Sequence, residues 1–152
     1  MTTTLINIAQ DKALRIYGAI DCCLYYTSGK KTKPAHLIEF KRGKGQKPFT
    51  QDIKRLAALI NSAAEINNRT SKSRFETAYF ITTTQYLESH TNEYVRNHMY
   101  EKLKRVDDQI QEEYKEISLE YDVFQLGKSL HNDELNNTRN AWAVIVEIST
   151  HQ

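Results

Sequence analysis

Three charged residues at a fixed spacing are the first candidates for chemistry in this sequence. Asp21 is separated by seventeen residues from the run Glu39-Phe40-Lys41. Carboxylate oxygens are the ligands that Mg²⁺ prefers, and the ion keeps several waters when few carboxylates hold it. Such a metal lowers the pKa of a bound water and neutralises charge on a phosphodiester, and a nearby lysine can orient that water or stabilise the developing negative charge. We interpret Asp21 and Glu39 as metal ligands that form a candidate catalytic set with Lys41.

Two short segments must position these side chains. Residues 19–26 are apolar and aromatic apart from Asp21, and residues 35–42 carry the Glu-Phe-Lys run, so both predict β-strands. A polar loop joins them, which favours an antiparallel hairpin. Partner positions that sum to 60 put Asp21 opposite Glu39, and a sum of 62 puts it opposite Lys41. Either even register keeps the three residues on one face, whereas a slip of one residue turns Asp21 to the other face.

Strand alternation also assigns the faces of the second strand. Glu39 and Lys41 share one face, while Ile38 and Phe40 share the other. We expect the apolar pair to enter the core and the ionic pair to point toward a cleft or solvent. Like charges opposite each other in a hairpin are destabilising, so Asp21 and Glu39 need a cation between them. We therefore expect neutralising Glu39 to be neutral or stabilising when metal is absent.

The loops beside this hairpin are basic, although the whole chain has a net charge of only +2. Lysine and arginine contact phosphates when they lie in loops without a recognition helix. Residues 88–116, by contrast, carry eight acids against five basic residues and should face water or a basic partner. The candidate nucleic-acid contacts are Lys30, Lys31, Lys33, Arg42, Lys44 and Lys47.

The remaining pattern predicts a mixture of helices and strands. Apolar residues at three-and-four spacing predict a helix capped by Thr50 and a long amphipathic helix from about Thr91 to Ile117. Further strands are expected at residues 75–84, 121–126 and 141–148, the last one covered on both faces; the first seventeen residues fit helix and strand templates alike. This order predicts one α/β domain over residues 1–152, with a central mixed sheet and flanking helices.

The acid-x-Lys strand carries a family resemblance. Asp21 and Glu39-Phe40-Lys41, on consecutive strands with a helix after them, resemble the PD-(D/E)xK nuclease superfamily, and the run His-Leu-Ile-Glu-Phe-Lys-Arg-Gly (36–43) is similar to its signature strand. The resemblance implies a restriction-endonuclease-like fold in which the two acids hold Mg²⁺ or Mn²⁺ and the lysine assists the water. RecB-like members also carry a glutamine on the following helix; Gln51 is the matching accessory position, and Arg55 stands in place of their tyrosine.

Two functions are consistent with these residues. The first is a Mg²⁺-dependent endonuclease that hydrolyses phosphodiester bonds in DNA or RNA, acting as a homodimer or in a larger assembly because two strands must be cut. The second is a non-catalytic interaction protein on the same scaffold: a nucleic-acid-binding subunit, an inhibitor or an immunity partner. The acidic long helix and the lack of any glutamate before Glu39 favour the second.

Composition limits the setting of either function. The two cysteines, Cys22 and Cys23, are adjacent and cannot form a disulfide framework, which indicates a reducing cytoplasmic compartment. No stretch approaches the roughly 18 apolar residues that a membrane-spanning helix needs. The expected partner is therefore nucleic acid or another protein, and not a membrane.

Overall fold

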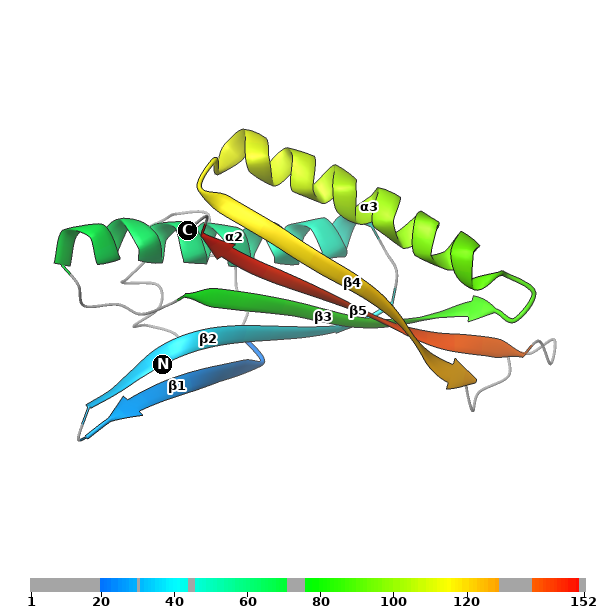
Figure 1. The fold of residues 1–152 in the computed structure, drawn as a ribbon, viewed down its shortest axis with the longest axis horizontal. Coiled ribbons are helices and arrows are strands. Elements are labelled where there is room, and N and C mark those ends of the chain that lie inside the picture. The colour runs from blue at the N-terminus through cyan, green and yellow to red at the C-terminus, as the bar shows by residue number, and fades with distance from the viewer. Residues whose placement is uncertain (1–19, 30, 44–45, 71–75, 129–137, 151–152) are drawn as a thin grey trace.

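The fold is described from a computed structural model of the chain (Figure 1). It describes residues 20–29, 31–43, 46–70, 76–128 and 138–150, with backbone alone at residues 28, 31–34, 46–48 and 65–70. The segment before residue 18, for which helix and strand templates fitted alike, lies outside the described residues.

One mixed β-sheet and two helices make up the described chain (Figure 1). The elements are β1 (Cys22–Ser28), β2 (Lys31–Arg42), α2 (Gln46–Thr70), β3 (Thr77–Leu87), α3 (Asn92–Glu113), β4 (Ile117–Lys128) and β5 (Arg139–Thr150). The five strands lie in the order β1-β2-β3-β5-β4. Only β2 and β3 are parallel, joined by the α2 crossover, and every other neighbouring pair is antiparallel. The α/β class with a central mixed sheet is therefore confirmed.

The β1–β2 hairpin adopts one of the even registers. Cys22 pairs with Ile38, which is the register with a sum of 60. A bulge between Leu24 and Tyr25 shifts the register in the part of the hairpin nearest its turn. The strands extend to Ser28 and Lys31, so most of the loop expected at residues 27–34 is strand. Backbone ladder hydrogen bonds form whatever the side-chain polarity, so polar residues at a sheet edge need not end a strand.

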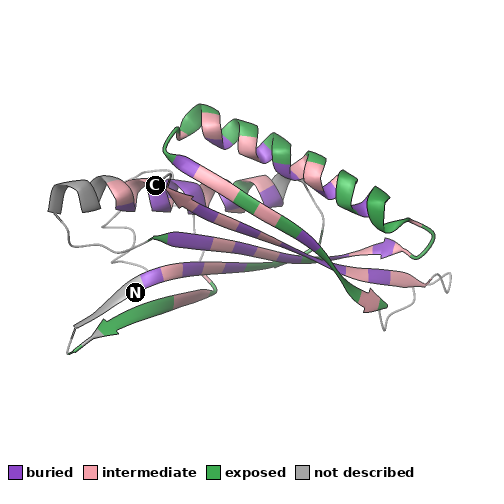
Figure 2. Cartoon of the chain, in the orientation of Figure 1, coloured by how far each residue is buried: buried purple, intermediate pink, exposed green. Residues whose placement is uncertain are grey.

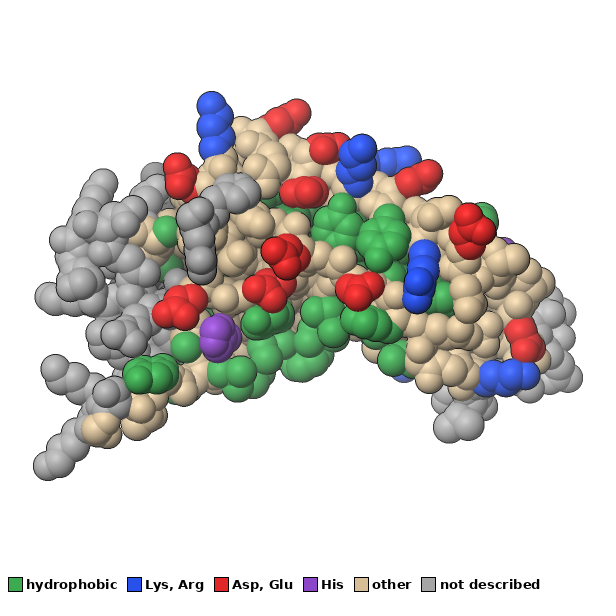
Figure 3. Space-filling model, viewed as in Figure 1, with side chains coloured by type: hydrophobic (Ala, Val, Ile, Leu, Met, Phe, Trp, Pro, Cys, Tyr) green, Lys and Arg blue, Asp and Glu red, His purple; other side chains and the backbone are tan. Residues whose placement is uncertain are grey.

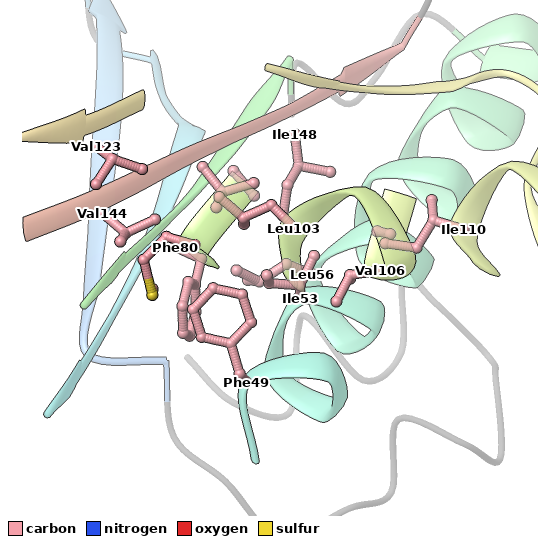
Figure 4. Packing of buried hydrophobic residues seen from close by; sticks show 14 of the residues in the cluster. Phe49, Ile53, Leu56, Phe80, Leu103, Val106, Ile110, Val123, Val144 and Ile148 are labelled. Carbon is pink, nitrogen blue, oxygen red and sulfur yellow. The ribbon is translucent and has the colours of Figure 1, made fainter. Parts of the chain in front are cut away.

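Both helices pack on the same face of the sheet and form one core with it (Figure 4). The helices contribute apolar stripes, as their three-and-four spacing predicted. The strands contribute alternate residues, because successive side chains point to opposite faces. The residues labelled in Figure 4 are Phe49, Ile53 and Leu56 from α2, Leu103, Val106 and Ile110 from α3, and Phe80, Val123, Val144 and Ile148 from the strands.

The helix boundaries differ from two of the expectations. Thr91 caps α3, where its hydroxyl accepts a hydrogen bond of 3.1 Å from the Tyr94 amide. However, α2 begins at Gln46, so Thr50 lies inside the helix and is not its cap. The chain also leaves α3 at Tyr114, and Ile117 begins β4. Ile117 continues the apolar spacing of α3, but it is buried from a strand, which the spacing alone does not distinguish.

The face assignment for β2 was wrong. Leu37 and Glu39 are 1% and 2% exposed, whereas Phe40, which strand alternation places on the opposite face, is 51% exposed. Figure 2 shows β3 and β5 as buried or intermediate along most of their length, whereas β1 is mostly exposed. No described helix covers that opposite face, so β5 is buried mainly on one side: Val144 is fully buried and Ile145 only partly. Figure 3 shows hydrophobic side chains gathered over β1 and β2 on the face toward the viewer. The position of α2 therefore turns the ionic side of β2 inward.

Candidate functional site

The hairpin register brings Asp21 to the middle of β2. Asp21 lies one residue before β1, and its Oδ2 accepts a hydrogen bond of 2.7 Å from the backbone amide of Phe40. Because Cys22 pairs with Ile38, the chain reaches Asp21 beside Glu39. The side chain of Asp21 thus takes the place of a strand partner for the Phe40 amide. The expected meeting of Asp21 with the Glu-Phe-Lys strand is present in the structure.

Glu39 is a buried carboxylate with two cationic neighbours. Its Oε1 lies 3.0 Å from Lys41 Nζ and 2.9 Å from Arg55 Nη2. Its Oε2 is buried and has no hydrogen-bond partner. A buried charge is tolerated only when it is paired, because leaving water costs several kcal/mol per ion (about 3–5 kcal/mol if one partner is removed). The cation expected beside Glu39 is therefore supplied by the chain itself.

Helix α2 supplies two residues of the site that the sequence analysis did not assign to it. Asp52 lies 3.5 Å from Lys41 Nζ through Oδ2 and 3.6 Å from Arg55 Nη2 through Oδ1. Glu39, Lys41, Asp52 and Arg55 thus form a group of alternating charge, here called the charged cluster. The available signal was that Asp52 and Arg55, three positions apart on one helix face, border the buried stripe of α2.

Backbone contacts after β2 hold the cluster's lysine in place. Gly43 has a φ of 113°, a conformation that glycine adopts without steric cost. Its amide donates to the carbonyl of Thr83 at 2.8 Å, and the Thr82 hydroxyl donates to its carbonyl at 3.1 Å. Thr82 is also the register partner of Lys41 across the parallel strands. These two hydrogen bonds therefore fix the end of β2, which carries Lys41, to β3.

Lys41 is the cluster residue that reaches solvent. Its side chain is 42% exposed, while those of Glu39 and Arg55 are 2% and 12% exposed. The hydrogen bond to Glu39 raises the pKa of Lys41 above its ordinary value, and the charge of Asp52 adds to this effect although partial burial opposes it. Lys41 is therefore a cation throughout the physiological pH range, available to a solute at the mouth of the site.

Among the other residues proposed from sequence, Gln51 and Arg42 are the ones whose side chains are described, and neither has a contact with this cluster. Gln51 is exposed on α2, one position before Asp52. Arg42 is exposed and follows Lys41, so strand alternation directs it to the opposite face of the sheet. Lys30 and Lys44 lie outside the described residues, and for Lys31, Lys33 and Lys47 only the backbone is described.

The carboxylates of Asp21 and Glu39 are the oxygen donors that the sequence proposed for a divalent metal. No group of three or more His, Cys, Asp or Glu side chains that could hold a metal is found within the described ranges. The buried Oε2 of Glu39 is an acceptor without a hydrogen-bond partner. Asp21 accepts a hydrogen bond from the backbone amide of Phe40, the residue after Glu39 in β2. Two carboxylates with several retained waters is an arrangement that Mg²⁺ accepts. Asp21 and Glu39 would be its protein ligands.

Comparisons with protein-family models, with curated proteins and with solved structures found no match to this chain. In the part of the chain that the structure describes, no helix is long and apolar enough to cross a membrane.

Proposed function

We propose that this protein is a Mg²⁺-dependent nuclease of the PD-(D/E)xK type with a restriction-endonuclease-like fold. The observation that carries the proposal is the state of Glu39. This carboxylate is 2% exposed, it lies 3.0 Å from Lys41, and one of its oxygens has no partner. Buried acceptors are normally paired with a donor, a water or a cation, so Oε2 of Glu39 retains the capacity to bind a metal ion.

The surrounding fold supports the same proposal. Asp21 is held at the strand that carries the acid-x-Lys run, and the crossover through α2 leads to the parallel strand β3. Glu39 and Lys41 lie beside the helix that follows the signature, which is similar to the arrangement of the superfamily that the sequence resembles. The likeness to the superfamily lies in the arrangement and the types of these residues, and the proposed phosphodiester hydrolysis follows from the residue types.

Each residue then has a distinct task in phosphodiester hydrolysis. Asp21 and Glu39 would hold the metal, which supplies a water of lowered pKa and neutralises phosphate charge. Lys41, half-exposed and cationic, orients that water and stabilises the developing negative charge. Helix α2 covers the inner side of the site, so Glu39 and Arg55 act in a water-poor environment where charge interactions are strong.

A second function is favoured by a different observation. Oε1 of Glu39 already contacts two cations, and Asp21 already has a backbone partner, so the charges are largely balanced without metal. Phe40, Leu24 and Phe124, at 51%, 46% and 41% exposure, also lie on the sheet face that no described helix covers. These features suit a non-catalytic protein that binds a partner through this apolar face.

Cleavage assays separate the two functions. The purified chain is incubated with supercoiled plasmid and with single-stranded DNA and RNA, in EDTA, Mg²⁺ or Mn²⁺. The nuclease cuts only with metal, and Asp21→Asn, Glu39→Gln and Lys41→Met each lower the rate by roughly 100-fold or more, as expected for loss of about 3 kcal/mol of transition-state stabilisation. Lys41→Met should still bind Mn²⁺ in calorimetry, because lysine is not a ligand.

Lys54 and Glu113 provide a matched control. They form a surface ion pair of 3.4 Å between α2 and α3. Lys54→Met and Glu113→Gln make the same chemical changes as the site variants, and they should cleave at the wild-type rate. Cleavage that survives in all three site variants would come from a contaminant or another site. No cleavage and no metal binding by the wild type would leave the interaction protein as the function.

A further inference from the structure

The charged cluster has unused hydrogen-bonding capacity on the cation side as well as on the anion side. Arg55 Nε and Nη2 are both buried without a hydrogen-bond partner, although Nη2 lies within ion-pair distance of Glu39. Leaving a buried donor unpaired costs about 1–3 kcal/mol, and more when it is charged. Arg55 therefore retains hydrogen-bonding capacity at Nε, and at Nη2 beyond its ion pair with Glu39.

The two unpaired nitrogens belong to one edge of the guanidinium group. The N–H of Nε and one N–H of Nη2 lie in the plane of the group and point in parallel from this edge. This edge is the fork that binds two oxygens of a carboxylate or a phosphate at once. Asp52, at 3.6 Å from Nη2, is too distant to serve as a hydrogen-bond acceptor for that fork.

Lys41 adds a second cation at the same place. Lys41 Nζ and Arg55 Nη2 both contact Oε1 of Glu39, so the two cations lie on either side of a single oxygen atom. Lys41 is the more exposed of the two and provides the route by which an anion would approach. Glu39 would hold the metal ion through Oε2, and the metal would offset the repulsion between this carboxylate and a phosphate bound by Lys41 and Arg55.

We infer that Arg55 is the phosphate-binding residue of this site, receiving a phosphate group of the substrate on its Nε–Nη2 edge with Lys41 beside it. This deepens the proposed function, on which the identity of the substrate as a phosphodiester rests. Oε2 of Glu39 and Nε of Arg55 have no hydrogen-bond partner, and Arg55 Nη2 is ion-paired with Glu39 without forming a hydrogen bond. A metal-bound phosphate would supply a cation for the carboxylate oxygen and acceptor oxygens for the two nitrogens.

Inorganic phosphate is the probe that tests this inference without any cleavage. The full chain is melted with and without phosphate at constant ionic strength, in EDTA and in Mg²⁺. Phosphate that binds only the folded state raises the melting temperature by mass action. We expect the rise for the wild type and for Lys54→Gln, and an apparent phosphate affinity roughly 10- to 100-fold lower for Arg55→Gln, as loss of charge-assisted hydrogen bonds implies.

Arg55→Lys covers the case in which Arg55→Gln does not fold. Lysine keeps a positive charge beside Glu39 but lacks the fork, so this variant should fold and lose most of the phosphate effect. A full phosphate effect in Arg55→Lys, or none in the wild type under either condition, overturns the inference. In the second case the Glu39 carboxylate simply rotates to pair with the Arg55 edge, and Arg55 is only its structural partner.

Cleavage measured on the same proteins separates this inference from the proposed function. If phosphate binding depends on Arg55 but no metal-dependent cleavage occurs, the site binds phosphate and the nuclease proposal fails. If cleavage occurs and Arg55→Lys leaves KM and the phosphate effect unchanged, the nuclease stands and the role of Arg55 is rejected. A KM increase of roughly tenfold in Arg55→Lys, with a smaller change in kcat, is the result expected of a substrate-binding residue.

Discussion

The Phe40 backbone amide donates a 2.7 Å hydrogen bond to the Asp21 carboxylate, although nineteen positions separate the two residues. Asp21 thus has a structural role at the start of β1 whether or not it also binds metal. The bond is made at the backbone between the two faces of the sheet: the Phe40 side chain lies on the open face, while Glu39 and Lys41 face α2. Experiments on Asp21 must separate these two roles.

Substitution of Asp21 by Asn or Ala makes that separation. Asparagine keeps an oxygen that accepts from Phe40, so Asp21→Asn should melt close to the wild type, whereas Asp21→Ala should lose about 1 kcal/mol of stability. Both variants should lose the increase in melting temperature on adding Mn²⁺, because the anionic ligand is gone. Thermal melts in EDTA and in Mn²⁺ measure both effects. An Asp21→Asn variant with a full metal response would restrict Asp21 to its structural role.

Neutralising Glu39 should be destabilising, which reverses the sign expected from sequence. Glu39→Gln leaves Arg55, at 12% exposure, without its closest anion, and we expect a loss of about 3 kcal/mol in EDTA. The exposed pair of Lys54 and Glu113 is the comparison: Glu113→Gln should cost no more than about 1 kcal/mol. Urea unfolding of both variants measures the difference. Equal costs for the two variants would mean that the buried pairing contributes little.

The basic segment from residue 30 to residue 47 should give nucleic-acid binding its salt dependence. Removing one lysine that binds a phosphate should reduce the slope of log K against log salt by about 0.7 for single strands and about 0.9 for double strands. The test replaces Lys30, Lys31, Lys33, Lys44 and Lys47 with Ser and compares the result with Lys104→Ser and Arg105→Ser, which are exposed on α3. Anisotropy titrations at several salt concentrations give the slopes. If each lysine replaced in the basic segment changes the slope of log K against log salt no more than each residue replaced on α3, the basic segment is only a solvated surface.

Tyr86 should make the fold sensitive to alkali. It is 3% exposed, it donates a hydrogen bond of 3.1 Å to the sulfur of Met99, and burial, with a contribution from Tyr94, raises its pKa to about 12 from the ordinary 10.0. The unfolded state therefore ionises first, so the stabilisation is complete below pH 10 and falls as pH rises toward 12. The loss amounts to about 2–3 kcal/mol.

Tyr86→Phe removes that titration. Its free energy of unfolding should approach or exceed that of the wild type as pH rises from 10 to 12, while the exposed Tyr26→Phe follows the wild type throughout. Denaturant unfolding at several alkaline pH values gives the comparison. A constant difference between Tyr86→Phe and wild type over this range would show that Tyr86 ionises equally in both states.

Local pattern was sufficient for much of the secondary structure and for the hairpin of the site. Alternation along β2 placed Glu39 and Lys41 together, and their contact of 3.0 Å agrees. The requirement that Asp21 share their face selected the even registers, and the Cys22–Ile38 pair has one of them. These features depend on neighbours within one strand or across one short connection, where the side-chain period of two fixes the geometry.

The sequence by itself therefore determined which residues of the hairpin lie together, but not which side of the sheet they face. The packing of α2, the crossover helix between β2 and β3, decided it. The helix covers the side of β2 that carries Leu37 and Glu39 and leaves Phe40 exposed. The same packing brought Arg55 to Glu39 and Asp52 to Lys41, each from more than ten positions away. Strand alternation is unchanged when a strand is turned over, so only the tertiary contact with the helix distinguishes the two faces and assigns the cations to the buried carboxylate.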